Sequence, residues 1–380
     1  MLRLRRSIFT RLLSSPSASP ISHLHRLLSA VSPSPGLNVE EYLVDRCGLT
    51  RAQAIKASAK ISHLKSPTNP DAVLSFLAGL GLSTGDVSAV VAKDPKLLCS
   101  AVDKTLAPVV TGLAGLGLSR DEIARLVLVA RDRIRCRSIV SYLNYYLPIF
   151  GSFHNLLRAL KFNNSLLGYN LERTVKPNVT FLRECGLHDC DIAKLSIAAP
   201  SMLTNNLDRV RATVACAERL GVPRASPMFR HALHALAFDT EDTVAAKLDY
   251  LKKTFNWSDA EVAIAVSRAP LVLTRSKATL QGRSDFLMSE VGLEPAYIAH
   301  RPAILSYSLE GRLRPRYYVL KFLKENGLLQ RERSYFSAVI VTEKVFVDRY
   351  ICPHKEAAPH LAQDYATACG GQVPTRFRFA

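Results

Sequence analysis

The stretch that decides the fold is Thr174–Val210, which reads TVKPNVTFLRECGLHDCDIAKLSIAAPSMLTNNLDRV. It holds two runs of apolar residues at helical spacing, with Gly186 between them. Gly186 suits the position just after a helix end, because glycine adopts positive φ without a Cβ clash. Pro200 cannot continue the i→i−4 hydrogen bonds, so the second helix is expected to stop there. The stretch predicts a helix, a tight turn, a second helix and a proline break within about 35 residues.

The same punctuation recurs along most of the chain. Turn residues like Gly186 follow one another at intervals of about 35 residues, which is the signature of a solenoid. Pro95 and Pro270 are as far from their turns as Pro200 is from Gly186, whereas Pro302 comes earlier and predicts a second helix about one turn shorter. The turns fall at Gly81-Leu82, Gly117-Leu118, Gly151, Gly186-Leu187, Gly221-Val222, Asn256-Trp257, Gly292-Leu293 and Gly327-Leu328.

Helix starts are marked after several of these turns. Ser119 with Glu122, and Ser258 with Glu261, have the spacing of a capping box. Repeats of this kind bury their apolar faces against their neighbours rather than in one central core. The sequence therefore predicts an all-α solenoid, a superhelix of helix-turn-helix repeats with proline breaks.

The charge balance indicates an acidic partner. The 380 residues include 50 Lys and Arg against 32 Asp and Glu, a net charge of +18. Such an excess is typical of proteins that bind nucleic acid or an anionic membrane face. Nucleic acid is the expected partner, bound by a monomer, and no membrane span is expected.

Residues 1–38 have the composition of an organelle transit peptide. They contain five arginines, many serines and no acidic residue. The first acidic residue of the chain is Glu40. Mitochondrial import is favoured over chloroplast import, and the alternative is a basic N-terminus that is merely disordered. Without this leader the chain keeps 45 basic and 32 acidic residues, a net charge of +13. The basic excess therefore belongs to the folded part as well.

Three further segments follow the leader. Residues 39–70 are expected to form an N-terminal helical cap and linker, with a capping box that opens at Thr50 and a proline-rich separator at residues 66–70. Residues 71–352 hold the repeats. Residues 353–380 contain proline and a Gly-Gly pair and are expected to form a flexible C-terminal tail.

The sequence contains no motif of a catalytic or cofactor site. It lacks the Gly-x-Gly-x-x-Gly, Gly-x-x-x-x-Gly-Lys and Gly-x-Ser-x-Gly patterns. Its eight cysteines form no Cys-x-x-Cys pair, and no carboxylate completes a zinc-hydrolase pattern with His231 and His234. We therefore expect a protein that is not an enzyme and that binds no cofactor or metal.

Three short segments carry a resemblance to a known family. Phe76–Ser83 (FLAGLGLS), Asp94–Leu98 (DPKLL) and Arg268–Leu273 (RAPLVL) are similar to the mitochondrial transcription termination factor (mTERF) family, particularly its plant members. The resemblance covers roughly residues 40–350. It implies repeats of two α-helices and a short 3₁₀ segment after the proline, and a basic concave groove that binds nucleic acid in an organelle. Three repeats depart from the pattern in lacking the proline, near Arg131, Asn164 and Ala235.

A cation recurs near the start of most repeats, shortly after the proline break. These residues, called the repeat cations below, are Lys104, Arg137, Arg173, Arg209, Lys277 and Arg312. Their register predicts one positive group per repeat along a single edge of the superhelix, beside helix N-termini whose free N–H groups favour phosphate. The alternative is that they pair with the preceding acids, or with acids of the neighbouring repeat, and only solubilise the surface.

Two denser clusters extend this candidate interface. The first adds Arg131, Arg133 and Arg135 to Arg137, and the second adds Arg314 and Arg316 to Arg312. Alternating positions spread around the circumference of a helix, so not all of these residues face one groove. Exposed tyrosines would stack on bases, although helical spacing favours packing between repeats. The tyrosines concerned are Tyr142, Tyr145, Tyr146, Tyr317 and Tyr318.

Three functional classes remain open at this stage. Binding of double-stranded DNA in the regulation or termination of organelle transcription is first, by resemblance and by charge. RNA binding in organelle intron splicing or ribosome assembly is second. Pentatricopeptide proteins share the period of about 35 residues, but a proline inside the unit and the Gly-Leu turn fit them poorly. A protein-interaction scaffold is third, because it does not require a net charge of +13.

Overall fold

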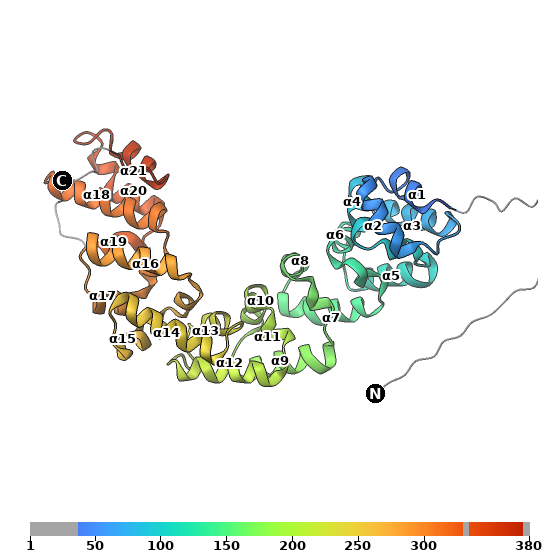
Figure 1. Ribbon diagram of the computed structural model, residues 1–380, viewed down its shortest axis with the longest axis horizontal. Coiled ribbons are helices and arrows are strands. Elements are labelled where there is room, and N and C mark those ends of the chain that lie inside the picture. Colours follow the sequence, from blue (N-terminus) through green and yellow to red (C-terminus); the bar gives the residue numbers. More distant parts are fainter. Residues whose placement is uncertain (1–36, 330–333, 375–380) are drawn as a thin grey trace, which may run out of the picture. The chain divides into compact units, whose positions relative to one another are not determined.

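The computed structural model describes residues 37–329 and 334–374, apart from the side chain of Arg131. Every regular element in these ranges is helical, which confirms the predicted all-α repeat fold (Figure 1). The chain divides into two compact units, one up to Ala107 and one from Pro108 onward. All but the last two residues of the predicted leader lie outside the described ranges.

The first unit contains the N-terminal cap and the first repeat. Its elements are α1 (Val39–Asp45), α2 (Arg51–Ile61), α3 (Thr68–Gly79), α4 (Thr84–Lys93), η1 (Pro95–Cys99) and η2 (Val102–Leu106). The capping box at Thr50 is confirmed, since its side chain accepts the N–H of Gln53 at 3.3 Å and its own N–H donates to Gln53 Oε1 at 3.0 Å. The separator predicted at residues 66–70 is wrong in part. Pro70 stands in the first turn of α3, where a missing N–H costs no hydrogen bond.

The second unit contains the remaining repeats and a C-terminal cluster. Its first half consists of α5 (Ala107–Gly115), α6 (Arg120–Ala130), η3 (Arg131–Arg135), α7 (Ser138–Phe150), α8 (Phe153–Phe162), η4 (Asn164–Leu167), η5 (Leu171–Val175), α9 (Lys176–Glu184), α10 (Asp189–Ala198), α11 (Ser201–Thr204) and α12 (Leu207–Arg219).

The rest of this unit runs from α13 to α21. Its elements are α13 (Phe229–Leu236), α14 (Glu241–Phe255), α15 (Asp259–Arg268), η6 (Pro270–Thr274), α16 (Lys277–Asp285), η7 (Phe286–Glu290), α17 (Pro295–His300), η8 (Pro302–Ser306), η9 (Leu309–Leu313), α18 (Arg314–Glu325), α19 (Tyr335–Ile340), α20 (Glu343–Tyr350), η10 (Cys352–His354) and α21 (Leu361–Cys369).

Successive repeats pack helix against helix. The second helices α6, α8, α10 and α13 contact one another in order along the chain, and the first helices α9 and α12 do the same. These helices bury aliphatic side chains such as Leu156, Val179, Ile192 and Leu233. Each repeat therefore takes its stability mainly from its neighbours, as in a solenoid.

The predicted turns and breaks are confirmed. Gly186 has φ +88°, and Asn256, the one non-glycine turn residue of the series, has φ +52°. Helix α10 ends at Ala198, two residues before Pro200, because the proline ring cannot enter the helix. Helix α17 has 6 residues against 10 in α10, as the early Pro302 predicts.

Three first helices open with a π turn, a feature that the sequence pattern did not predict. The π turns are η2, η5 and η9, and each is followed two residues later by a proline, Pro108, Pro177 or Pro315. In η5 the N–H of Val175 donates to the carbonyl of Asn170 at 3.2 Å, five residues earlier. A proline has no N–H and crowds the carbonyl four residues before it, and a wider turn accommodates both effects.

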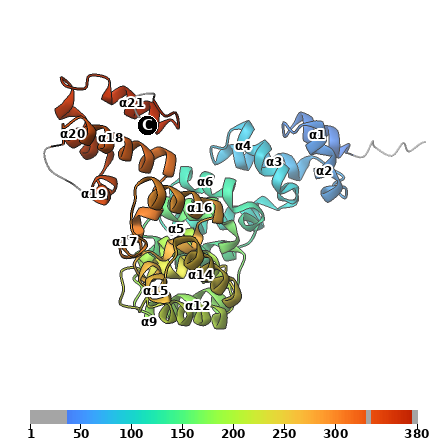
Figure 2. The same ribbon diagram turned by 60° about the vertical axis from the view of Figure 1, so that its left-hand side comes forward.

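The C-terminal segment differs from the predicted flexible tail. Within residues 353–374, helix α21 buries Leu361, Tyr365 and Ala368 and packs against α18. Helices α18, α20 and α21 gather into one cluster in both views (Figures 1 and 2). The apolar spacing of these three residues is that of one helix face, and the Gly-Gly pair only ends the helix.

Candidate nucleic-acid interface

The repeat cations lie where one repeat ends and the first helix of the next begins. Polar side chains cap these first helices. Asn170 Oδ1 accepts the N–H of Arg173 at 2.8 Å, and Asn206 Oδ1 accepts the N–H of Arg209 at 2.8 Å. Because each cap satisfies one backbone donor, only part of each helix N-terminus stays open to a phosphate.

Equal spacing in the sequence does not give the repeat cations equal positions on their helices. Lys104, Arg173 and Arg209 each stand three residues after the N-cap. Lys277 stands one residue after its cap, Arg312 stands four after, and Arg137 is itself the N-cap of α7. One residue turns the side chain by about 100° around an α-helix, so the six side chains do not share one direction.

In the second unit, the acids beside the repeat cations are paired with other residues. Each such acid contacts a cation three or four residues further along the same helix. The pairs are Glu172 with Lys176 (2.6 Å), Asp208 with Arg211 (3.3 Å) and Glu310 with Arg314 (2.8 Å). The alternative that these repeat cations are neutralised by the preceding acid is therefore wrong for Arg173, Arg209 and Arg312.

Four repeat cations are exposed. They are Lys104, Arg137, Arg173 and Lys277. Within the described part of the chain, no hydrogen bond or ion pair engages the guanidinium of Arg173. The ammonium of Lys277 lies 5.2 Å from the centre of the Tyr250 ring, whose hydroxyl donates to the Lys277 carbonyl at 2.9 Å. Exposure distinguishes these four side chains from those of Arg209 and Arg312.

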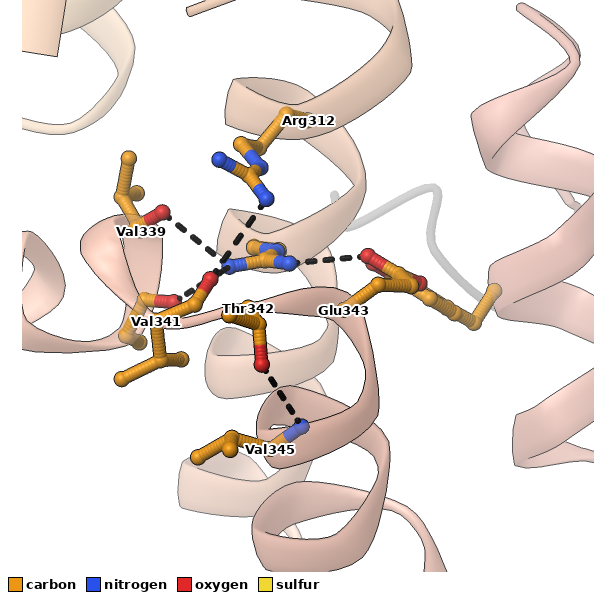
Figure 3. Close-up of polar contacts among 9 residues, drawn as sticks. Arg312, Val339, Val341, Thr342, Glu343 and Val345 are labelled. Atoms are coloured by element: carbon orange, nitrogen blue, oxygen red, sulfur yellow. Dashed lines mark hydrogen bonds and ion pairs between the residues drawn. The ribbon is translucent and has the colours of Figure 1, made fainter.

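Arg209 and Arg312 instead connect the start of a first helix to the end of the second helix of the same repeat. Arg209 Nη2 donates to the carbonyl of Asp239, just beyond α13. Arg312 Nη2 lies 3.5 Å from the carbonyl of Val341, just beyond α19 (Figure 3). Both side chains are half-buried. Carbonyls at a helix C-terminus lack intrahelical donors and favour a cation, which explains why arginine suits these two positions.

The first cluster of arginines does not form one exposed patch. The side chain of Arg131 lies outside the described residues. Arg133 is half-buried, with Nε 3.8 Å from Asp132, and Arg135 is also half-buried. A Cβ placed on Gly168 would lie 3.1 Å from Arg133 Nη2, so this guanidinium packs closely on the neighbouring backbone. Of the cluster's described side chains, Arg137 is the exposed one.

The second cluster is mainly structural. Arg314 contacts Glu310 at 2.8 Å and Glu290 at 3.5 Å, and its guanidinium lies 5.5 Å from the centre of the Phe286 ring. Arg316 has no exposed side-chain surface. A groove role for Arg316 is therefore wrong, because no phosphate reaches it.

Arg316 is the hub of the C-terminal cluster. Its Nη1 donates to the carbonyls of Ala338 (2.8 Å), Val339 (3.0 Å) and Val341 (2.8 Å), and its Nη2 contacts Glu343 Oε2 at 2.8 Å. Figure 3 labels three of these partners, Val339, Val341 and Glu343. A buried guanidinium with these partners satisfies the carbonyls that α19 leaves open.

The same arrangement recurs in other repeats and was missed by sequence reasoning. A polar residue inside a first helix donates to carbonyls of the turn that follows the second helix. Asn69 does so to Leu98 (2.7 Å), Asn178 to Leu203 (3.0 Å), and Arg283 to Leu305. The available signal was a polar residue on an apolar face: Asn178 adjoins Val179 and is 1% exposed. Such a residue needs a buried partner.

Three of the tyrosines serve packing, Tyr142 and Tyr146 within one repeat and Tyr317 between repeats. Tyr146 is fully buried and donates to the carbonyl of Leu166 at 3.1 Å. The Tyr142 hydroxyl donates to the backbone carbonyl of Tyr169 at 2.6 Å, and the Tyr317 hydroxyl donates to the backbone carbonyl of Glu290 at 2.7 Å. Burial raises the pKa of Tyr146 and of Tyr317, which keeps both hydroxyls protonated as donors. The packing interpretation therefore holds for these three side chains.

Residues 37–329 and 334–374 contain neither a metal-binding cluster nor a membrane-spanning helix. In these ranges no three His, Cys, Asp or Glu side chains are arranged to hold a metal ion. No helix in the same ranges is both long and apolar enough to cross a membrane.

The fold and this interface define a class, a helical-repeat protein whose repeat junctions carry exposed cations. The family model described as mTERF matches residues 133–347, and the chain belongs to the mTERF family. This agrees with the resemblance seen in the sequence.

Three relatives give the range of similarity. The chloroplastic transcription termination factor MTERF8 of Arabidopsis thaliana is 22% identical over 263 residues, which cover 68% of this chain and 51% of the relative. The mitochondrial transcription termination factor MTEF18 of Arabidopsis thaliana is 28% identical over 108 residues, or 28% of this chain and 19% of the relative. The mitochondrial transcription termination factor 3 of Drosophila melanogaster is 22% identical over 240 residues, or 53% of this chain and 68% of the relative. The chain thus spans about half the length of MTERF8 and about a fifth of MTEF18.

Proposed function

We propose that the chain binds nucleic acid in an organelle, with double-stranded DNA as the target and transcription or its termination as the process. The observation that carries the proposal is the exposed guanidinium of Arg173, whose neighbouring acid Glu172 is paired with Lys176 at 2.6 Å. An unneutralised cation beside a helix N-terminus suits a phosphate. The names of the relatives and the net charge of +18 support the same function.

The proposed contacts are made by the four exposed repeat cations. Lys104, Arg137, Arg173 and Lys277 would each contact a backbone phosphate, while Arg209 and Arg312 each hold the two helices of one repeat together. Such contacts position a protein on a duplex without reading its sequence. Four of them imply a salt slope of about −3.5 on duplex DNA.

Binding of the full chain to duplex DNA and to structured RNA of matching sequence, between about 50 and 200 mM salt, tests the proposal. Arg173→Gln should weaken binding and reduce the slope by about 1. Lys253→Gln is the matched control, because Lys253 is exposed at the far end of α14, away from the repeat junctions. Equal losses from both variants would reduce the repeat cations to general surface charge. Preference for RNA would favour the second candidate, RNA binding in intron splicing or ribosome assembly.

The organelle is proposed to be the mitochondrion, with the chloroplast as the alternative. Support comes from the arginine-rich leader without acids and from relatives named as mitochondrial or chloroplastic. A fluorescent reporter fused to residues 1–38 tests this. Import into chloroplasts would reverse the choice, and a cytosolic reporter would remove the targeting role of the leader.

A further inference from the structure

One exposed arginine outside the repeat cations is held by aromatic rings of two successive repeats. Arg301 follows the last residue of α17, directly before Pro302. Its guanidinium carbon lies 4.2 Å from the centre of the Tyr297 ring in α17 and 5.9 Å from the centre of the Phe336 ring in α19. Contacts of this kind restrict a long side chain and leave the N–H edge of the guanidinium available.

The position is unusual among the proline junctions. The residue before the proline is Asp94, Ala199 or Ala269 in the others, and the first two are buried. At Arg301 the side chain is exposed. In the part of the chain that the structure describes, the guanidinium of Arg301 contacts these two rings, and no carboxylate or carbonyl accepts a hydrogen bond from it.

A guanidinium that is fixed in place and lacks an acceptor is matched to a ligand with two adjacent acceptors. Arginine presents its donors as a rigid planar fork, which pairs with two oxygens of a phosphate or with the O6/N7 edge of a guanine. Lysine carries the same charge as a single point and cannot form the paired contact.

We propose that Arg301 is a nucleic-acid-binding residue that contacts a pair of adjacent acceptors on the bound nucleic acid. This rests on the proposed nucleic-acid binding. Tyr297 and Phe336 act as positioning residues that hold the guanidinium before the ligand arrives, so less side-chain freedom is lost on binding.

The test compares Arg301→Lys, Arg301→Gln and Tyr297→Leu with the unchanged chain, using sequences selected from randomised duplex DNA and structured RNA pools. If the acceptors are a guanine edge, Arg301→Lys should lose about 5- to 150-fold on the selected sequence and little on unrelated sequences. If they are phosphate oxygens, Arg301→Gln should weaken binding to all sequences alike and reduce the salt slope by about 1, more than Arg301→Lys does. Tyr297→Leu should show a smaller loss of the same kind.

Arg120→Gln is the control, because Arg120 is exposed at the start of α6. Unchanged affinity, slope and selected sequence in Arg301→Gln, or a loss equal to that of Arg120→Gln, would overturn the inference and leave the proposed function standing. Absence of binding by the unchanged chain to either pool would overturn both.

Discussion

Arg312 and Arg316, one helical turn apart, converge on the same acceptor, the carbonyl oxygen of Val341, at 3.5 and 2.8 Å. Their spacing in the sequence favours two surface cations beside one groove. In the structure Arg312 is half-buried and Arg316 fully buried, and both connect α18 and its π turn to the end of α19. A basic stretch in a repeat protein can therefore hold the two helices of one repeat together rather than bind a ligand.

Arg316→Leu should open the C-terminal cluster. The change uncovers the carbonyls of Ala338, Val339 and Val341, and each buried acceptor left unsatisfied costs about 1–3 kcal/mol. Hydrogen exchange should show lost amide protection in α19–α21, with little change in α12–α14, since repeats depend mainly on their neighbours. Arg314→Leu is the control, because its exposed acids can return to water. Full protection in the Arg316 variant would contradict the assigned role.

Arg209→Gln should mainly lower stability, whereas Arg173→Gln should mainly weaken nucleic-acid binding. Arg209 donates to the Asp239 carbonyl, so its loss should lower the free energy of unfolding by about 0.5–1.5 kcal/mol in urea denaturation. Arg173→Gln should change it by less than about 0.5 kcal/mol and act on the salt slope instead. Equal destabilisation by both variants would show that Arg173 also makes a structural contact.

Gly186→Ala should destabilise the chain although no atom blocks the new methyl group. The φ of +88° is the cause, since it costs an L-residue about 1–2 kcal/mol. Gly115→Ala is the matched control, because Gly115 lies in helix α5 with equally open space around it. Alanine is the better helix former, so this variant should gain up to about 1 kcal/mol. Chemical denaturation of the two variants separates the backbone effect from packing.

Stability should fall as the pH drops below about 6.5. Burial, followed by the charge of Arg230, lowers the pKa of His231 and of His234 on α13. Protons then bind the unfolded chain more tightly, so the free energy of unfolding decreases from about pH 6.5 down to the folded-state pKa and levels off below it. Denaturation of the double variant His231→Gln/His234→Gln between pH 7.5 and 5 should show a flatter dependence. Parallel curves would assign the effect to other groups.

The fold was readable from the sequence because its signals are local. A glycine at positive φ, a serine cap and a proline break each act within a few residues, and their recurrence defines the repeat without knowledge of the long-range contacts. The start of α3 at Thr68 and the helix α21 were missed because proline and Gly-Gly read alike in a helix end and in a loop.

The interface was harder to read for a different reason. Whether an arginine faces solvent depends on acceptors about 20–30 residues away, such as the Asp239 carbonyl for Arg209, and composition carries no trace of them. The partners of the preceding acids were equally hard to predict. Glu172 pairs with Lys176, four residues further on, rather than with the adjacent Arg173.

The π turn of η5 sets the rotational phase between the start and the body of α9. A turn closed five residues back holds one residue more than an α-helical turn. Its cap Asn170 and the cation Arg173 are therefore offset by about 100° from where an uninterrupted helix would put them. The number of residues in this turn, and not only their type, thus determines the direction of the Arg173 side chain.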